Sequence, residues 1–214
     1  MKVLSLLQPW ASLLVQGHKK IETRSWKTKY RGPLLIHASA GKAGAAICKT
    51  EPFRQFIPDF KALPFGAIIG RVELIDIWPS EVVWFARAAG IGVKDALQER
   101  AFGDYNPNRY GWGTRNQMEL PTPIPCSGAL SVWDTCNAKA FKIQELRGSG
   151  RIAFSVIYWG KVLANFFNKE EAETMIKELC KDKMEHSIFP ASNHVSRRIQ
   201  EIEHELFVRP FVLE

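Results

Sequence analysis

Short strand-like segments recur through the first 136 residues, and they constrain the fold more than any other feature of the sequence. Each segment is rich in β-branched, leucine or aromatic residues and is bounded by glycine, proline or polar residues, as strands are. They are residues 2–7, 20–24, 34–38, 67–78, 110–115 and 128–134. One two-turn helix is expected between Pro9 and Gly17. Many short strands and few helices predict a small closed β-barrel with helices packed on it.

Two internal features fit such a barrel. Gly70 lies inside the longest strand candidate, where glycine permits the bend that closing a barrel requires. Three prolines alternate through residues 121–125, and this spacing requires extended backbone and excludes a helix. Both features therefore favour a curved sheet over a helical bundle.

The pattern changes after Asp134. Residues 152–158 and 161–167 are two strand candidates, and Asn168 with Glu171 forms an N-cap pair that opens a helix. A last helix is expected from near Ser196. The apolar residues on the inner faces of these two helices are Ala172, Met175, Ile176, Leu179 and Cys180, followed by Ile199, Ile202 and Leu206. We expect an α+β protein with a barrel over residues 1–136 and a ββαα appendage over residues 138–214.

The composition is that of an ordinary globular protein, with 46% hydrophobic and 24% charged residues. No apolar run reaches the roughly 18 to 20 residues of a membrane span, and Gln8-Pro9 interrupts the N-terminal apolar run too early for a signal peptide. The four cysteines are widely spaced and form no C-x-x-C pair, which fits reduced thiols in the cytoplasm. Neither a metal site nor a cofactor is expected, because the histidines lack ligand spacing.

Positive charge is concentrated in the N-terminal part, where residues 1–137 hold 17 basic and 11 acidic side chains. Its densest run is residues 18–31, HKKIETRSWKTKYR, in which cations alternate with aromatic rings. Cations that neutralise phosphates beside rings that stack on bases are typical of single-stranded nucleic-acid grooves. The candidate binding residues are Lys19, Lys20, Arg24, Trp26, Lys27, Lys29, Tyr30 and Arg31, with Tyr110 and Trp112 as further stacking rings. The alternative is a solvated basic strand and turn with Trp26 in the core.

Glu22 is the one acid in this run and allows two interpretations. Period-two alternation places Lys20, Glu22 and Arg24 on one strand face, which favours an ion pair between Glu22 and Arg24. The alternative is a catalytic pair of Lys19 and Glu22, because neighbouring cations can favour the neutral, basic form of a lysine.

Residues 4–26 resemble the opening of the ASCH domain family. The family motif G-x-K-x-x-E-x-R is matched by Gly17, Lys19, Glu22 and Arg24. Further similar segments are Gln8-Pro9-Trp10-Ala11, Arg31-Gly32, residues 66–76, residues 102–105 and residues 109–112. The resemblance covers about residues 1–136, whereas residues 138–214 resemble nothing known to us.

The resemblance implies a PUA-like β-barrel with a cleft beside the first helix, lined by motif residues. These would be Gln8, Pro9, Trp10, Gly17, Glu22 and Arg24. The superfamily is associated with RNA modification and nucleic-acid binding, and one ASCH group hydrolyses N4-acetylcytidine with a lysine, a threonine and a glutamate. Glu22 occupies the position of that threonine, and we expect Thr23 on the opposite strand face, so this activity is not carried over.

Two hypotheses therefore remain. A binding module would contact RNA, or single-stranded or flexible DNA, through its cations and rings; the sequence does not separate RNA from DNA and identifies no protein partner. A hydrolase acting on a modified nucleoside or on RNA would use Lys19 and Glu22 for proton transfer. The sequence favours binding, because no complete set of acid, base and nucleophile is visible.

Overall fold

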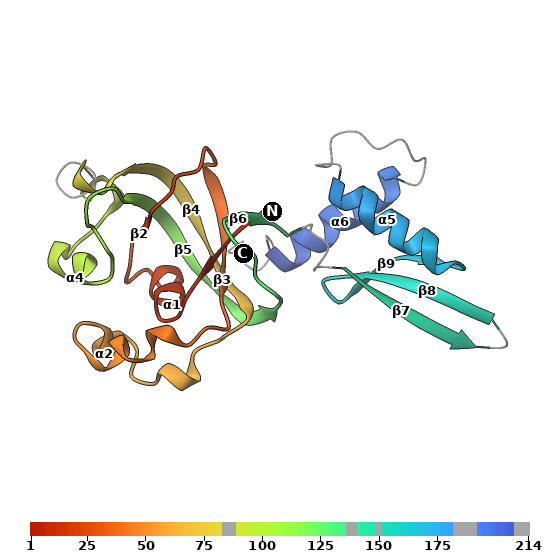
Figure 1. Cartoon of the computed structure of the whole chain (residues 1–214), viewed down its shortest axis with the longest axis horizontal. Coiled ribbons are helices and arrows are strands. Elements are labelled where there is room, and N and C mark those ends of the chain that lie inside the picture. Colours follow the sequence, from red (N-terminus) through yellow and green to blue (C-terminus); the bar gives the residue numbers. More distant parts are fainter. Residues whose placement is uncertain (83–88, 136–140, 149–150, 182–191, 208–214) are drawn as a thin grey trace. The chain divides into compact units, whose positions relative to one another are not determined.

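The computed structural model describes residues 1–82, 89–135, 141–148, 151–181 and 192–207, which form two compact units (Figure 1). The first unit is Met1–Trp133 and the second is Asp134–Glu214. No helix in the described ranges is long and apolar enough to cross a membrane.

The first unit is built on a six-stranded sheet with the strand order β2-β5-β4-β3-β1-β6. Its strands are β1 (Lys2–Leu6), β2 (Ile21–Arg24), β3 (Gly32–Ala38), β4 (Ala67–Pro79), β5 (Tyr110–Pro125) and β6 (Val132–Asp134). β1 and β3 are parallel, whereas β3 with β4, β4 with β5, and β2 with β5 pair antiparallel. Register shifts along β4 and β5 let the sheet curl, as Figure 1 shows. The predicted α+β class is confirmed, and the curled sheet is consistent with the predicted small-barrel architecture.

The expectation of full closure is wrong for the described strands, since β2 and β6 end the order and are not paired with each other. The helix α1 (Trp10–Val15) packs against β1, β3, β4 and β5 and covers the inside of the curl (Figure 1). All its residues except Trp10 are buried, and Gly17 ends the turn with φ of 79°. The helix and the extended β2 lie where the sequence predicts them.

Short helices cover the side of α1 that faces away from the sheet. They are η1 (Ala43–Ala45), η2 (Ile47–Lys49), α2 (Phe53–Phe56) and η3 (Phe60–Ala62). Later in the chain, η4 (Ala89–Ile91) packs through Ile91 against Ile21 of β2, and α4 (Ala96–Ala101) leads into Phe102. Leu13 of α1 packs there with Phe53 and Phe102, whereas Leu14 packs into the sheet core with Leu34 and Val72. α1 therefore lies between two apolar clusters, which fixes its position.

The described residues of the second unit form a three-stranded antiparallel sheet with two helices. Its elements are β7 (Phe141–Gly148), β8 (Arg151–Tyr158), β9 (Lys161–Phe166), α5 (Lys169–Lys181) and α6 (Ser192–Phe207). The expected ββαα arrangement is thus wrong by one strand, because β7 carries a mixed sequence in which Phe141 is buried, Ile143 is half-buried and residues 144–147 are exposed. α6 also begins before Ser196, whereas the Asn168 cap is present, since Asn168 Oδ1 accepts the Glu170 N–H.

The core of the second unit forms where the sheet meets both helices. Val156 and Tyr158 of β8 pack with Ala172 of α5 and with Ile199 and Ile202 of α6. Met175, Ile176, Leu179 and Leu206 pack against this core. The predicted inner faces of the helices are therefore confirmed, apart from Cys180, whose side chain lies outside the described part. Cys136 also falls outside the described residues.

Candidate functional site

Lys19 is the centre of a buried ionic network and is completely inaccessible to solvent. Its Nζ donates to the carbonyl oxygens of Ile21, at 2.5 Å, and Phe102, at 3.1 Å. It also lies 3.7 Å from a carboxylate oxygen of Glu22 and 4.0 Å from one of Glu99. A buried charge is tolerated only when it is paired and hydrogen-bonded. Lys19 therefore joins β2 to the end of α4, and its ammonium is not available to a ligand.

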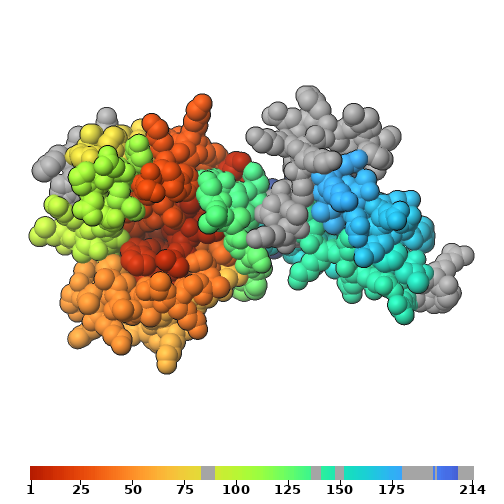
Figure 2. All heavy atoms as spheres, viewed as in Figure 1, coloured from red at the N-terminus to blue at the C-terminus, as the bar shows by residue number. Residues whose placement is uncertain are grey.

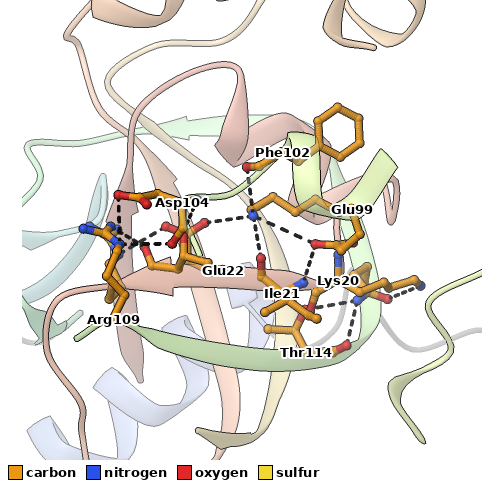
Figure 3. A network of polar contacts seen from close by, with 12 residues as sticks. Lys20, Ile21, Glu22, Glu99, Phe102, Asp104, Arg109 and Thr114 are labelled. Carbon is orange, nitrogen blue, oxygen red and sulfur yellow. Dashed lines mark hydrogen bonds and ion pairs between the residues drawn. The ribbon is translucent and has the colours of Figure 1, made fainter. Parts of the chain in front are cut away.

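Glu99 is a network member that the sequence did not indicate. It is 2% exposed, and its oxygens accept the backbone N–H groups of Lys20, at 2.8 Å, and Ile21, at 3.0 Å (Figure 3). Burial raises the pKa of the Glu99 carboxyl, against the opposing effects of Lys19 and these two N–H donors. Burial, followed by the charges of Glu99 and Glu22, also raises the pKa of Tyr105. Glu99 thus fixes the start of an edge strand and supports Lys19.

Glu22 lies at the boundary between this network and solvent. One carboxylate oxygen is 3.2 Å from Arg24 Nε, the ion pair that the strand spacing predicts, and the other faces Lys19. Arg24 also donates to the carbonyl oxygen of Ser5, at 2.8 Å. The Glu22 side chain is 10% exposed, and in the described part of the chain these two ion pairs are its polar contacts. Unlike Glu99, it accepts no backbone N–H there.

The exposed edge of Glu22 faces a pocket of about 310 Å³. Its lining residues are Trp10, Glu22, Thr23, Ile47, Phe53, Ala101, Phe102, Gly103, Asp104 and Arg109. They come from α1, β2, the short helices and the loop after α4. Figure 2 shows these red, orange and yellow-green segments meeting on one face of the unit. Trp10 and Phe53 meet edge to face with ring centroids 6.0 Å apart, so one wall is aromatic.

Another part of the pocket lining is polar and is held by Arg109. Its Nε lies 3.2 Å from an Asp104 carboxylate oxygen, and its Nη2 donates to the Thr23 carbonyl oxygen at 3.3 Å (Figure 3). The Asp104 N–H in turn donates to Thr23 Oγ1 at 3.0 Å. Thr23 therefore lines the same pocket as Glu22, because the loop after α4 folds over the edge of β2.

The remaining predicted cations differ in what they contact. Lys20 Nζ donates to Gln117 at 3.0 Å, and Arg31 pairs with Asp76 at 2.6 Å. Lys27 and Lys29 are exposed, and Lys27 Nζ lies 5.7 Å from the centroid of the Tyr110 ring. The six cations of the basic run therefore do not form one patch.

The predicted aromatic residues also separate into core and surface positions. Trp112 is fully buried, and its indole N–H donates to the Trp26 carbonyl oxygen at 3.2 Å, so the expectation that it stacks on bases is wrong. Trp26, Tyr30 and Tyr110 are half-buried against the sheet core.

Two expected cleft residues are structural. Gln8 is completely buried, and its side chain bonds Ser12 and the Pro64 carbonyl oxygen. Pro9 is buried as well, so Trp10 is the residue of this segment that reaches the pocket. In the described part of the chain, no group of three or more histidine, cysteine or acidic residues is placed to hold a metal.

Comparison with known proteins identifies the family. The sequence profile of the ASCH domain matches residues 4–110. Activating signal cointegrator 1 from Homo sapiens and from Mus musculus are each 39% identical to this chain over 138 residues, which is 61% of this chain and 21% of each relative. The chain thus spans about a fifth of the length of these curated relatives.

Solved structures of an ASCH protein from Zymomonas mobilis are similar to this chain as well. The crystal structure of this ASCH protein is 19% identical to the chain, with a TM-score of 0.35, and the match covers 58% of this chain and 72% of that one. A mutant of that protein is 17% identical, with a TM-score of 0.34, over 58% of this chain and 74% of that one. On the profile match over residues 4–110, this chain belongs to the ASCH domain family.

Proposed function

We propose that this protein binds RNA, or single-stranded or flexible DNA, by taking one base into the pocket beside α1. The observation that carries the proposal is the pocket itself, which combines an aromatic wall with a carboxylate and a guanidinium in one unit of an ASCH protein. Its volume of about 310 Å³ is at the lower end of the roughly 300–1,000 Å³ of small-molecule sites. A base that is unstacked from a flexible strand is a ligand of suitable shape and polarity.

The Trp10 ring supplies the stacking surface in this proposal. It is half-buried, packs edge to face on Phe53, and lines the pocket. Stacking of a base on an aromatic side chain contributes roughly 1–3 kcal/mol per base. Trp112, which the sequence indicated as a stacking ring, has no comparable role because it is buried in the core.

We assign the contacts with the nucleic-acid phosphates to the exposed lysines that follow β2. Lys27 and Lys29 lie on the chain segment that leaves β2, the strand that places Glu22 and Thr23 in the pocket. Their ammonium groups are exposed, so a phosphate can approach them without displacing a buried partner. The formal charge of +7 on the chain favours a polyanionic ligand.

The hydrolase alternative receives less support from the same contacts. Lys19 would have to leave two carbonyl oxygens and two carboxylates in order to act as a base, and it is 0% exposed. Glu22 reaches the pocket together with Thr23, but in the described part of the chain the Thr23 hydroxyl accepts the Asp104 N–H and is not hydrogen-bonded to a base. We therefore assign Lys19 to the fold and Glu22 to ligand contact.

A salt titration tests the proposal. The affinity for a fluorescent 12-nucleotide single-stranded RNA is measured between 50 and 300 mM KCl for the parent protein and for the double variant Lys27→Gln, Lys29→Gln. At about 0.7 per phosphate contact, the log-log slope should become less steep by roughly 1.4 in the variant. Lys61→Gln with Lys94→Gln is the matched control, since both lysines are exposed in the same unit.

The same mixtures are analysed for products. Binding without turnover of the RNA or of acylated nucleosides is the expected result. If the log-log slope of affinity against salt is unchanged in the double variant, Lys27 and Lys29 do not contact phosphates. Turnover that disappears in Glu22→Gln would instead favour the hydrolase.

A further inference from the structure

We propose that the pocket selects guanine, with the Glu22 carboxylate accepting the two N–H groups of the guanine Watson–Crick edge. This inference rests on the proposed function and adds to it the identity of the base. It starts from the difference between the two buried carboxylates of the network.

Among the described residues, Glu99 accepts hydrogen bonds from the protein, whereas the polar contacts of Glu22 are ion pairs. Both oxygens of Glu99 accept backbone N–H groups. The Glu22 carboxylate is equally part of the network, but in the described residues its polar contacts are the ion pairs with Lys19 and Arg24. A carboxylate has about four acceptor positions, so the edge of Glu22 that faces the pocket retains acceptor capacity. A carboxylate that is nine-tenths buried and retains acceptor positions favours a ligand that supplies hydrogen-bond donors.

The charge of Glu22 is balanced before a ligand arrives. Arg24 Nε is 3.2 Å from one oxygen and Lys19 Nζ is 3.7 Å from the other. The ligand therefore does not need to be a cation, and a neutral molecule with paired N–H donors satisfies the remaining lone pairs. Hydrogen bonds to an ionised acceptor are roughly twice as strong as neutral ones, which makes such donors selective.

Among the four RNA bases, guanine matches this requirement best. Its N1–H and its N2 amino group lie side by side and point in the same direction, so both oxygens of a carboxylate are bonded. Adenine and cytosine place a ring nitrogen acceptor beside their amino group, and uracil places a carbonyl oxygen on each side of its N3–H. Each of these arrangements directs a lone pair at the second carboxylate oxygen, which is repulsive.

The rest of the pocket fits the same base. Guanine carries the acceptor O6 next to N1–H, and the cation that lines this pocket is Arg109. Trp10 and Phe53 provide the aromatic wall for a purine ring. The pocket thus combines an acceptor, a donor and an aromatic face in one place.

Competition between oligonucleotides tests the inference. Eleven-nucleotide uridine strands carrying one central G, A, C or inosine compete with a labelled RNA for the parent protein. We expect the G strand to bind roughly 10- to 100-fold more tightly than the A and C strands, the range typical of a bidentate pair. Inosine lacks the N2 amino group, so its strand should bind with intermediate affinity.

Glu22→Gln gives the protein side of the test. Glutamine offers one acceptor and one donor in place of two acceptors, so the preference for G over A should fall to less than about threefold. Glu119→Gln is the matched control, since Glu119 is exposed and lies outside this pocket. If Glu22→Gln fails to fold, the comparison of G with inosine on the parent protein still decides the question.

The outcomes separate the two proposals. Tight binding of all strands without a preference for G would overturn the guanine inference and leave nucleic-acid binding intact. A preference for A or C would overturn it in the same way. No measurable binding of any strand would overturn both.

Discussion

The two halves of the basic segment near the N-terminus have similar charge and opposite roles. Residues 19–24 enter the edge strand β2, where Lys19 is completely buried and Glu22 and Arg24 are ion-paired. Residues 25–31 form the loop that follows, where Lys27 and Lys29 are exposed. One half therefore builds the site, and the other half carries exposed positive charge. Charge density in a sequence locates such a region but does not distinguish these two uses.

The difference between the halves is energetic as well as spatial. Removing one partner of a buried ion pair typically costs 3–5 kcal/mol, because the other charge stays buried and unpaired. An exposed pair such as Arg31 with Asp76 contributes about 0–1 kcal/mol, because solvent screens it. Substitutions in the two halves should therefore change stability and binding in different proportions.

The largest effect is expected at Lys19. Lys19→Met removes the charge that faces Glu22 and Glu99 and leaves two buried carbonyl oxygens without their donor. The free energy of unfolding, measured by urea denaturation, should fall by about 3–5 kcal/mol. Lys27→Met is the control and should change it by less than about 0.5 kcal/mol. Equal losses of unfolding free energy in the two variants would show that the two halves of the basic segment contribute equally to stability.

Glu99→Gln should have the next largest effect. The amide keeps one acceptor and loses the other, so one backbone N–H of Lys20 or Ile21 becomes unsatisfied, at a cost of roughly 1–3 kcal/mol.

The pH dependence of this loss gives a second test. Because burial raises the pKa of Glu99 above its ordinary value of 4.5, the folded parent protein holds this proton more tightly than the unfolded chain does. The Glu99 contribution to parent stability is therefore fully present below pH 4.5 and is lost as the pH rises through the raised pKa. Glutamine does not titrate, so the loss caused by Glu99→Gln should be larger at pH 4 than at pH 7. A loss that grows with pH would contradict this assignment.

The smallest effect is expected in the exposed half. Arg31→Gln breaks the pair with Asp76, in which the arginine side chain is 36% exposed. Thermal denaturation should detect a loss below about 1 kcal/mol, and 0.5 M NaCl should reduce the difference further. A loss as large as that of Lys19→Met would mean that this loop is part of the structural network.

The sequence predicts the strands and the first helix well, because their patterns depend on neighbouring residues. Apolar periodicity places α1 and β1, and alternation places β2 within one residue of its observed start. β7 was missed because its polar and exposed residues after Ile143 also fit an exposed loop. Local pattern thus predicts buried faces and fails where one face is solvated.

The site was less predictable because its contacts join distant parts of the chain. Glu99 bonds the backbone of Ile21, 78 residues away, and a glutamate in a short helix ordinarily lies on the surface. Lys19 gave no sign of burial, since its neighbours in the sequence are also cations. Trp112 and Trp10 are both tryptophans in family-like segments, and only the packing separates the core ring from the pocket ring.

The most direct test of the account compares those two tryptophans during one titration. The indole N–H signals of ¹⁵N-labelled protein are assigned with Trp10→Phe and Trp112→Phe and followed as single-stranded RNA is added. We expect the Trp10 signal to shift in a saturable way while the Trp112 signal moves little, because one ring lines the pocket and the other is buried. A saturable shift elsewhere with an unchanged Trp10 signal would place binding outside the pocket and contradict the account.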